Sequence, residues 1–191
     1  MKKAIFFILI VGFSLSLFSA DEKAILKKYD LSAKVDNVQG FTTYMPKRAS
    51  DRNRIFIYIV KRHMDNSFSL RLRIAYYAPE MLYLKRFVFT FGEEELDILV
   101  RDTVRMQSLE RLNIPGNYYD QQSGGICEYY DIAMNAEEID LMKKVAASKG
   151  VKMKYEGTKG FEKIKIHKGE TKVIKRVFDA LEAFNAQKGT K

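Results

Sequence analysis

Cysteine, histidine, proline and tryptophan are scarce in this chain of 191 residues, which has one cysteine, two histidines, three prolines and no tryptophan. Because Cys127 has no partner, an internal disulfide is excluded and the fold must be stabilised by its core. Three prolines and eleven glycines exclude a collagen-like or broadly disordered polymer. Hydrophobic residues make up 47% of the chain and charged residues 30%, as in globular proteins. A chain of this length can bury a real core as a single domain.

The common sequence signatures of catalysis and metal binding are also missing. His63 and His167 stand in no metal-ligand spacing, no serine lies in a Gly-x-Ser-x-Gly elbow, and no glycine-rich phosphate loop precedes a helix. We therefore expect no enzyme activity, no cofactor and no metal. Cys127 is interpreted as a small buried hydrophobic residue, and the alternative is a thiol–imidazole pair with His167 in a cysteine-dependent hydrolase. The acidic run 93–97 is interpreted as a charged hairpin tip, with a calcium site as the alternative.

The first twenty residues have the pattern of a secretory signal peptide. Lys2 and Lys3 form a basic start, and an apolar run follows over residues 4–18. This run is shorter than the roughly 20 apolar residues that a membrane span needs. We predict cleavage after Ala20, export to the periplasm or the medium, and no transmembrane segment in the mature chain. An uncleaved anchor is the alternative.

Positive charge is concentrated at the C-terminal end. The chain has 33 Lys and Arg against 24 Asp and Glu, a formal net charge of +9. Removal of residues 1–20 lowers the net charge to +7, and residues 143–191 alone carry fourteen basic and five acidic side chains, or +9. Residues 21–142 are left with −2. This asymmetry indicates either an anionic partner or a solvated face.

Alternating apolar and polar residues predict antiparallel strands over most of the chain. The clearest is 68–77, where Leu70, Leu72 and Ile74 alternate with polar residues, and 55–60 is apolar on both faces, typical of a strand covered on both sides. Further strands are predicted at 40–44, 82–91, 96–100, 126–132, 151–155 and 161–166. Residues 101–125 fit no single period.

Two helices are predicted late in the chain. Asn135 and Glu138 form a capping box that begins a helix ending near Gly150, and 171–186 is amphipathic. A short helix at 24–29 is a third candidate. Because βαβ alternation is absent, we predict a mainly β fold over residues 21–191. It would be an antiparallel sheet or β-sandwich with two or three flanking helices, and α+β is the alternative. The helices should cover a sheet face or close one end of a sandwich.

Lysines alternate with apolar residues in the predicted hairpin 151–166. Val151, Met153 and Tyr155 need the core, so the lysines between them should face outward together. A candidate surface for lipid headgroups or an acidic polymer consists of Lys152, Lys154, Lys163, Lys165, Lys172, Lys175 and Arg176. Simple solvation is the alternative, and nucleic acid is not expected as a partner.

Three stretches in order resemble a widespread family of uncharacterised exported bacterial proteins and lipoproteins. They are Phe-Thr-Thr-Tyr-Met-Pro-Lys at 41–47, Leu-Arg-Leu-Arg-Ile-Ala-Tyr-Tyr at 70–77 and Gly-Gly-Ile-Cys-Glu-Tyr-Tyr-Asp-Ile at 124–132, followed by the helix that Asn135 begins. The similarity spans most of residues 36–185. It implies a β-rich domain with a C-terminal helix and no known activity. Members of the family tend to carry tryptophan where Tyr44, Cys127 and Tyr129 stand, which implies a packing position for Cys127.

Three adjacent tyrosine pairs lie at 76–77, 118–119 and 129–130. Neighbours on a strand point to opposite faces, so each pair can place one ring in the core and one outside, where it packs or stacks on a sugar. The sequence therefore favours an exported, non-enzymatic binding or structural module that contacts an anionic envelope surface or another envelope protein. A glycan or cell-wall polymer binder is the first alternative, and a cysteine-dependent hydrolase is the second.

Overall fold

The computed structural model describes residues 19–47, 55–101, 105–108 and 126–188. Within these ranges the chain is mainly β, with two antiparallel sheets and three helices, which confirms the predicted fold class. Neither the cleavage after Ala20 nor the single-domain boundary at 21–191 is tested by the fold, and both stay predictions.

The larger sheet, sheet A, has six strands in the order β1-β2-β3-β4-β8-β7. Their bounds are β1 Leu31–Asp36, β2 Phe41–Pro46, β3 Ile55–Arg62, β4 Phe68–Ala78, β7 Arg105–Ser108 and β8 Ile126–Ala133. The first four strands follow one another as hairpins, whereas β8 pairs with β4 after a long excursion of the chain. β1 and β7 are additional to the eight predicted strands, and β7 lies in the segment to which no period could be assigned.

One face of sheet A forms the main core. Leu72 is fully buried and pairs with Ile57 on β3 and with Ile132 on β8. The alternation predicted for 68–77 is confirmed, because Leu70, Leu72 and Ile74 are buried while Arg71 and Arg73 lie half-buried on the opposite face. Residues 55–59 of β3 are buried on both faces, also as predicted.

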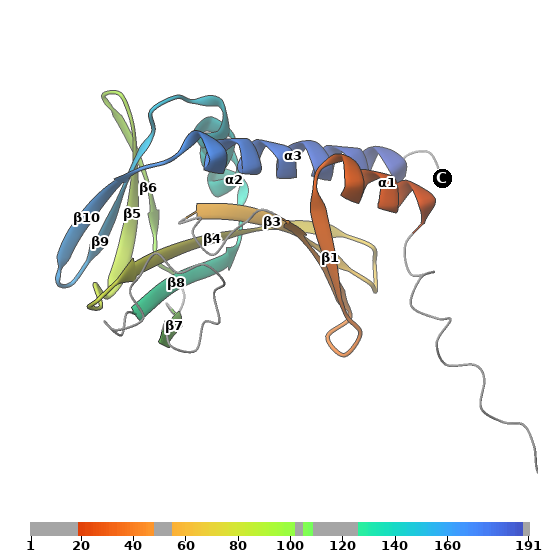
Figure 1. Ribbon diagram of the computed structural model, residues 1–191, viewed down its shortest axis with the longest axis horizontal. Helices are drawn as coiled ribbons and strands as arrows, with labels where there is room; N and C mark the ends of the chain where they lie inside the picture. The colour runs from red at the N-terminus through yellow and green to blue at the C-terminus, as the bar shows by residue number, and fades with distance from the viewer. Residues whose placement is uncertain (1–18, 48–54, 102–104, 109–125, 189–191) are drawn as a thin grey trace, which may run out of the picture.

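The smaller sheet, sheet B, has the order β10-β9-β5-β6 and consists of two hairpins side by side. Its strands are β5 Leu84–Phe91, β6 Glu94–Leu99, β9 Lys152–Gly157 and β10 Gly160–Lys165. It lies beyond one end of sheet A (Figure 1). The two sheets meet through aromatic side chains: the Tyr155 hydroxyl donates to the Ala75 carbonyl at 3.0 Å, and the Phe87 and Tyr130 rings are 5.6 Å apart.

Helix α3 (Lys168–Lys188) lies along the buried face of sheet A, with α1 (Ala20–Lys28) and α2 (Ala136–Ala147) packed beside it (Figure 1). The capping box of Asn135 and Glu138 is confirmed at the start of α2. α1 begins four residues earlier than predicted, because the Ser19 hydroxyl accepts a hydrogen bond from the Glu22 N–H and caps the helix. None of the helices within the described ranges is long and apolar enough to cross a membrane.

Candidate functional site

The structure places the four hairpin lysines on one face of sheet B. In the β9–β10 pairing Lys152 is the direct partner of Lys165, and Lys154 is the partner of Lys163. Direct partners in an antiparallel pair project to the same face, so the four ammonium groups stand on the outer side of the sheet. Met153 and Tyr155 between them are fully buried, which is the arrangement that the alternation predicts.

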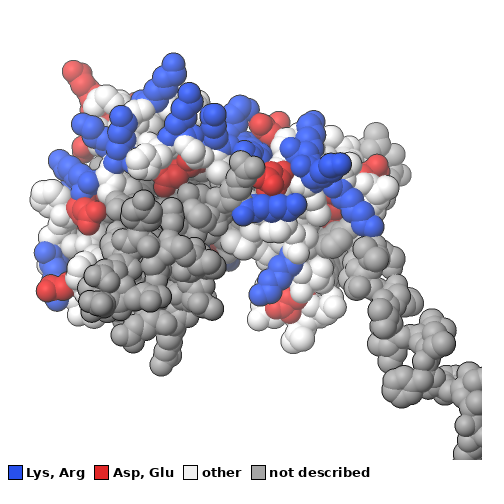
Figure 2. All heavy atoms as spheres, in the orientation of Figure 1, with Lys and Arg blue, Asp and Glu red and all other residues white. Residues whose placement is uncertain are grey.

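Ion pairs divide the seven predicted basic residues into two groups. Lys154 pairs with Glu156, Lys175 with Asp179 at 3.0 Å, and Arg176 with Asp30 at 3.2 Å. The other four are exposed and have no carboxylate partner among the described residues: Lys152, Lys163, Lys165 and Lys172. We call these four the unpaired lysines. They lie on β9, on β10 and in the first turns of α3, and Figure 2 shows basic side chains gathered along the side of the molecule on which α3 runs.

A partly buried polar network lies on the opposite face of sheet A from α3. The Tyr58 hydroxyl lies 2.8 and 2.9 Å from the two carboxylate oxygens of Asp131, and Arg71 Nε donates to Asp131 Oδ1 at 2.8 Å. Burial and then the Asp131 carboxylate hold the pKa of the Tyr58 phenol well above its usual value. Sequence analysis missed this network, because 60 residues separate Arg71 from Asp131 and only the β4–β8 pairing brings them together.

Of the two tyrosine pairs that the structure describes, the pair at 129–130 divides between the two faces as predicted, and the pair at 76–77 has no fully buried ring. Tyr130 is fully buried, whereas Tyr129 is half-buried on the other face of β8. The Arg73 guanidinium lies 4.4 Å from the Tyr129 ring centroid, so one face of this ring is already covered and the arrangement gives no support to sugar stacking. Tyr76 and Tyr77 are both half-buried. The pair at 118–119 lies outside the described residues.

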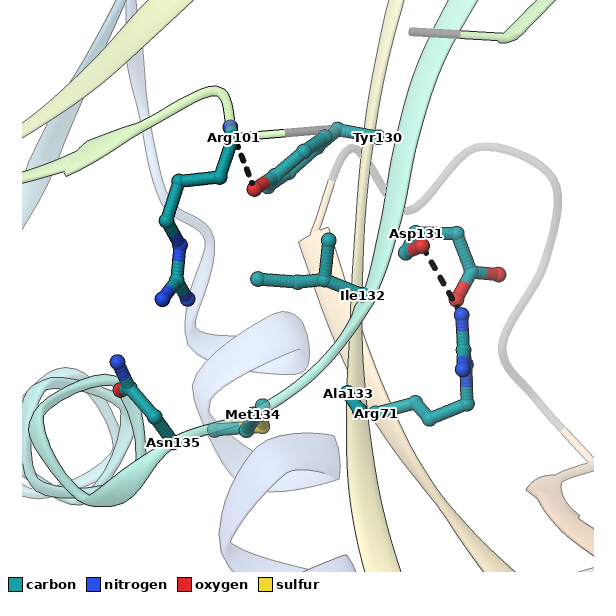
Figure 3. Close-up of a pocket in the computed structure, with 8 residues that line it drawn as sticks. All are labelled: Arg71, Arg101, Tyr130, Asp131, Ile132, Ala133, Met134 and Asn135. Carbon is teal, nitrogen blue, oxygen red and sulfur yellow. Dashed lines mark hydrogen bonds and ion pairs between the residues drawn. The ribbon is translucent and has the colours of Figure 1, made fainter. Parts of the chain in front are cut away.

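A cavity of about 420 Å³ surrounds the end of β8 (Figure 3). Tyr130 and Ile132 lie on one side of the strand and Asp131 with Arg71 on the other. The charged side chains that line it are already in ion pairs, Arg71 with Asp131 and Arg101 with Glu138. Among the described residues that line this cavity, none is a free acid, base or nucleophile.

A second hollow, a groove of about 590 Å³, separates β6 from α2. It is lined by Leu96, Asp97, Ile98, Leu99, Arg101, Asn135, Glu137, Glu138, Asp140, Leu141 and Lys144. Sequence analysis gave no indication of this groove, since the lining residues of its two walls, 96–101 and 135–144, are 34 or more residues apart in the chain.

The two chemical alternatives from the sequence gain no structural support. The Cys127 side chain is 2% exposed, consistent with the packing interpretation. Two acidic side chains of the β5–β6 hairpin have separate basic partners, Glu94 with Lys144 and Asp97 with Arg86. Among the residues that the structure describes, no three His, Cys, Asp or Glu side chains are grouped to hold a metal ion.

Comparison of this chain with protein-family models, with curated proteins and with solved structures finds no match. The resemblance to exported bacterial proteins and lipoproteins therefore stays a prediction from the sequence.

Proposed function

We propose that this chain is a non-enzymatic binding module of the bacterial cell envelope, periplasmic or secreted, that binds an anionic surface through its unpaired lysines. The proposal depends on one observation: the β9–β10 register places Lys152 directly opposite Lys165 and Lys154 directly opposite Lys163, while only Lys154 has a carboxylate partner. The export part of the proposal depends on the signal-peptide pattern of residues 1–20.

The arrangement of these lysines supports attraction to anions. Like charges on directly opposite strand residues destabilise a sheet by a few tenths of a kcal/mol or more per pair. An anionic surface would remove this repulsion. At an anionic membrane each nearby lysine contributes about 1 kcal/mol, so the four unpaired lysines would together supply on the order of 4 kcal/mol of binding free energy. Added salt shortens the Debye length, so it screens these exposed charges and weakens the binding.

The burial of Cys127 favours binding over catalysis. A nucleophilic thiol must reach its substrate as an exposed, activated thiolate. The Cys127 side chain is 2% exposed and pairs on β8 with Tyr77 of the central strand β4. Packing of this kind is typical of a structural cysteine.

Co-sedimentation with lipid vesicles tests the surface. We expect the wild type to bind vesicles that contain anionic lipid, to leave neutral vesicles unbound, and to dissociate as salt is raised. A variant with Lys→Gln at each unpaired lysine should lose this binding.

The matched control removes four exposed lysines from α1, from β1 and from the position after β2, at the other end of the molecule from sheet B (Figure 1). These are Lys27, Lys28, Lys34 and Lys47. Because both variants lose the same net charge, only a local surface gives them different affinities. Equal binding by the two variants, or no binding by the wild type, would contradict the proposal.

Mass spectrometry of the protein recovered from the envelope fraction tests export separately. We expect a mature chain without residues 1–20, and an intact Met1 would contradict cleavage.

A further inference from the structure

The β6 strand is an open edge of sheet B among the described residues. It pairs with β5 and has no partner on its other side. An edge of this kind presents a row of backbone N–H and C=O groups that can pair with another strand. The groove between β6 and α2 lies along this edge.

Three hydrogen bonds show which β6 backbone groups face the groove. The Val100 N–H donates to the Lys85 carbonyl at 2.9 Å, so Val100 and the residues two and four before it face β5. The Tyr130 hydroxyl accepts from the Arg101 N–H at 3.2 Å and lies 3.4 Å from the Leu99 carbonyl. The alternate residues Glu95, Asp97 and Leu99 therefore direct their backbone groups away from β5.

The opposite wall of the groove is one face of α2. Glu137, Asp140, Leu141 and Lys144 follow the spacing of neighbours on a helix surface. Two ion pairs connect the walls near the two ends of β6, Glu94 with Lys144 and Arg101 with Glu138. The groove is thus preformed, and the two ion pairs mark its ends along β6.

Acidic side chains on the α2 wall of the groove favour a ligand with basic side chains. Among the described residues Glu137 has no ion pair, and Asp140, whose side chain is 77% exposed, is ion-paired with Lys143 at 3.6 Å. A basic side chain on the α2 side of the groove would meet both carboxylates. On the outer side of sheet B, Leu99 is 60% exposed and offers an apolar contact.

We propose that the groove binds an extended peptide segment that adds to β6 as an antiparallel fifth strand of sheet B, with Lys or Arg at alternate positions toward α2 and apolar side chains beside Leu99. Antiparallel addition continues the pairing of every strand in this sheet. Alternate side chains then supply specificity while main-chain hydrogen bonds supply affinity. This site lies at the opposite edge of sheet B from β10 and is independent of the unpaired lysines.

The geometry predicts which peptide amides matter. In antiparallel pairing, a residue opposite Asp97 has its side chain on the outer face and its N–H directed to β6. Residues with side chains toward α2 have their N–H directed away. In a peptide of alternating lysine and valine, the valine amides therefore form the ladder, and the lysine amides are free.

The probe is a fluorescein-labelled peptide of seven residues, lysine alternating with valine, with blocked ends, and binding is measured by fluorescence anisotropy. We expect N-methylation of the valine amides to abolish binding and N-methylation of the lysine amides to preserve it. The reverse result, or equal binding by both peptides, would overturn antiparallel addition. Amide hydrogen exchange at Glu95 and Asp97 should slow when the peptide is bound.

Protein variants test the acidic wall. Glu137→Gln with Asp140→Asn changes two exposed side chains on α2, and we expect it to weaken peptide binding about two- to thirtyfold, because two exposed ion pairs of roughly 0.2–1 kcal/mol each would be lost. The control, Glu80→Gln with Glu182→Gln, removes the same charge at exposed positions outside the groove lining and should bind as the wild type does. Equal loss in both variants would overturn the site, because a general charge effect would then explain the binding.

Sedimentation of the protein alone tests the remaining occupant, a second copy of this chain. We expect the same sedimentation for the wild type and the Glu137→Gln, Asp140→Asn variant. Self-association that this variant abolishes would overturn the proposal in favour of pairing between copies. A net charge of +9 on the chain opposes general attraction of a basic peptide, so binding by the wild type points to a local site.

Discussion

Glu128 offers the sharpest test of how the two sheets are joined. Its side chain is 1% exposed on β8, and its two carboxylate oxygens accept hydrogen bonds from the N–H groups of Leu82 at 3.0 Å and Tyr83 at 2.8 Å. These donors lie in the connection between β4 and β5, where Tyr83 adopts the left-handed backbone region at φ +56°. A single carboxylate therefore holds the segment that leads from sheet A to sheet B.

The same connection is fixed from its other side by close contact with the β9–β10 hairpin. A Cβ on Gly157 would lie 2.1 Å from the Leu82 carbonyl oxygen, so glycine is required there for the backbones to approach. The Thr158 N–H donates to the Tyr83 carbonyl at 3.2 Å. With little room to relax, the connection cannot easily find new partners when the Glu128 carboxylate is changed.

We expect Glu128→Gln to lower the free energy of unfolding by about 2–6 kcal/mol. Glutamine keeps one acceptor oxygen but turns an NH₂ toward the second backbone donor, so one charge-assisted bond is lost and one buried N–H is left unsatisfied, each at about 1–3 kcal/mol. Equilibrium unfolding in urea measures the change. Glu80→Gln, exposed in the same connection, is the control and should stay within about 0.5 kcal/mol. A loss below about 1 kcal/mol for Glu128→Gln would refute the anchoring role of this carboxylate.

Three other changes follow from the described contacts. Leu72→Ala, at a fully buried position, should cost about 2–5 kcal/mol in a denaturant melt, and a cost under about 1 kcal/mol would contradict its place in the core. Cys127→Ala should keep the fold and lower the free energy of unfolding by less than about 2 kcal/mol. The wild-type thiol should react with iodoacetamide only after unfolding, and rapid labelling of the native protein would support a nucleophilic role for Cys127 instead. Tyr58→Phe should remove a stabilising contribution that depends on pH. The pKa of Tyr58 is raised in the folded state, so its contribution is complete below the unfolded value of about 10 and declines above it. In urea melts at rising pH, the difference in the free energy of unfolding between wild type and Tyr58→Phe should therefore become smaller above about pH 10. A difference that does not change with pH would contradict the network with Asp131.

Local patterns in the sequence predicted the elements whose faces differ strongly in polarity. The strand 68–77, the hairpin 151–166 and the capped start of α2 all have such patterns, and all are present in the structure. β1 was missed although Leu31, Ala33 and Val35 alternate with three polar residues, so the period of a strand was present in the sequence and was not used.

Sequence periodicity did not predict the features that depend on pairing between strands far apart in the chain. The β5–β9 pairing unites two hairpins into sheet B, and the β4–β8 pairing brings Arg71 to Asp131. Periodicity shows which face of a strand is buried but not which strand lies beside it. The lysine face could be predicted because it lies within a single hairpin, whereas the β6–α2 groove could not, because its walls meet only in the tertiary structure.

Tyr130 has a consequence for sheet growth. Its ring comes from sheet A, and its hydroxyl contacts the Leu99 carbonyl and the Arg101 N–H, the two groups through which an added strand would continue past Leu99. The side chain thus ends the edge that is open to pairing. An added strand cannot extend its hydrogen bonds past the phenol, and an added strand shifted by two residues toward Arg101 would collide with it. A short open edge disfavours the edge-to-edge pairing of strands from many chains by which exposed sheets aggregate. One buried tyrosine would in this way fix both the length and the register of whatever pairs with β6.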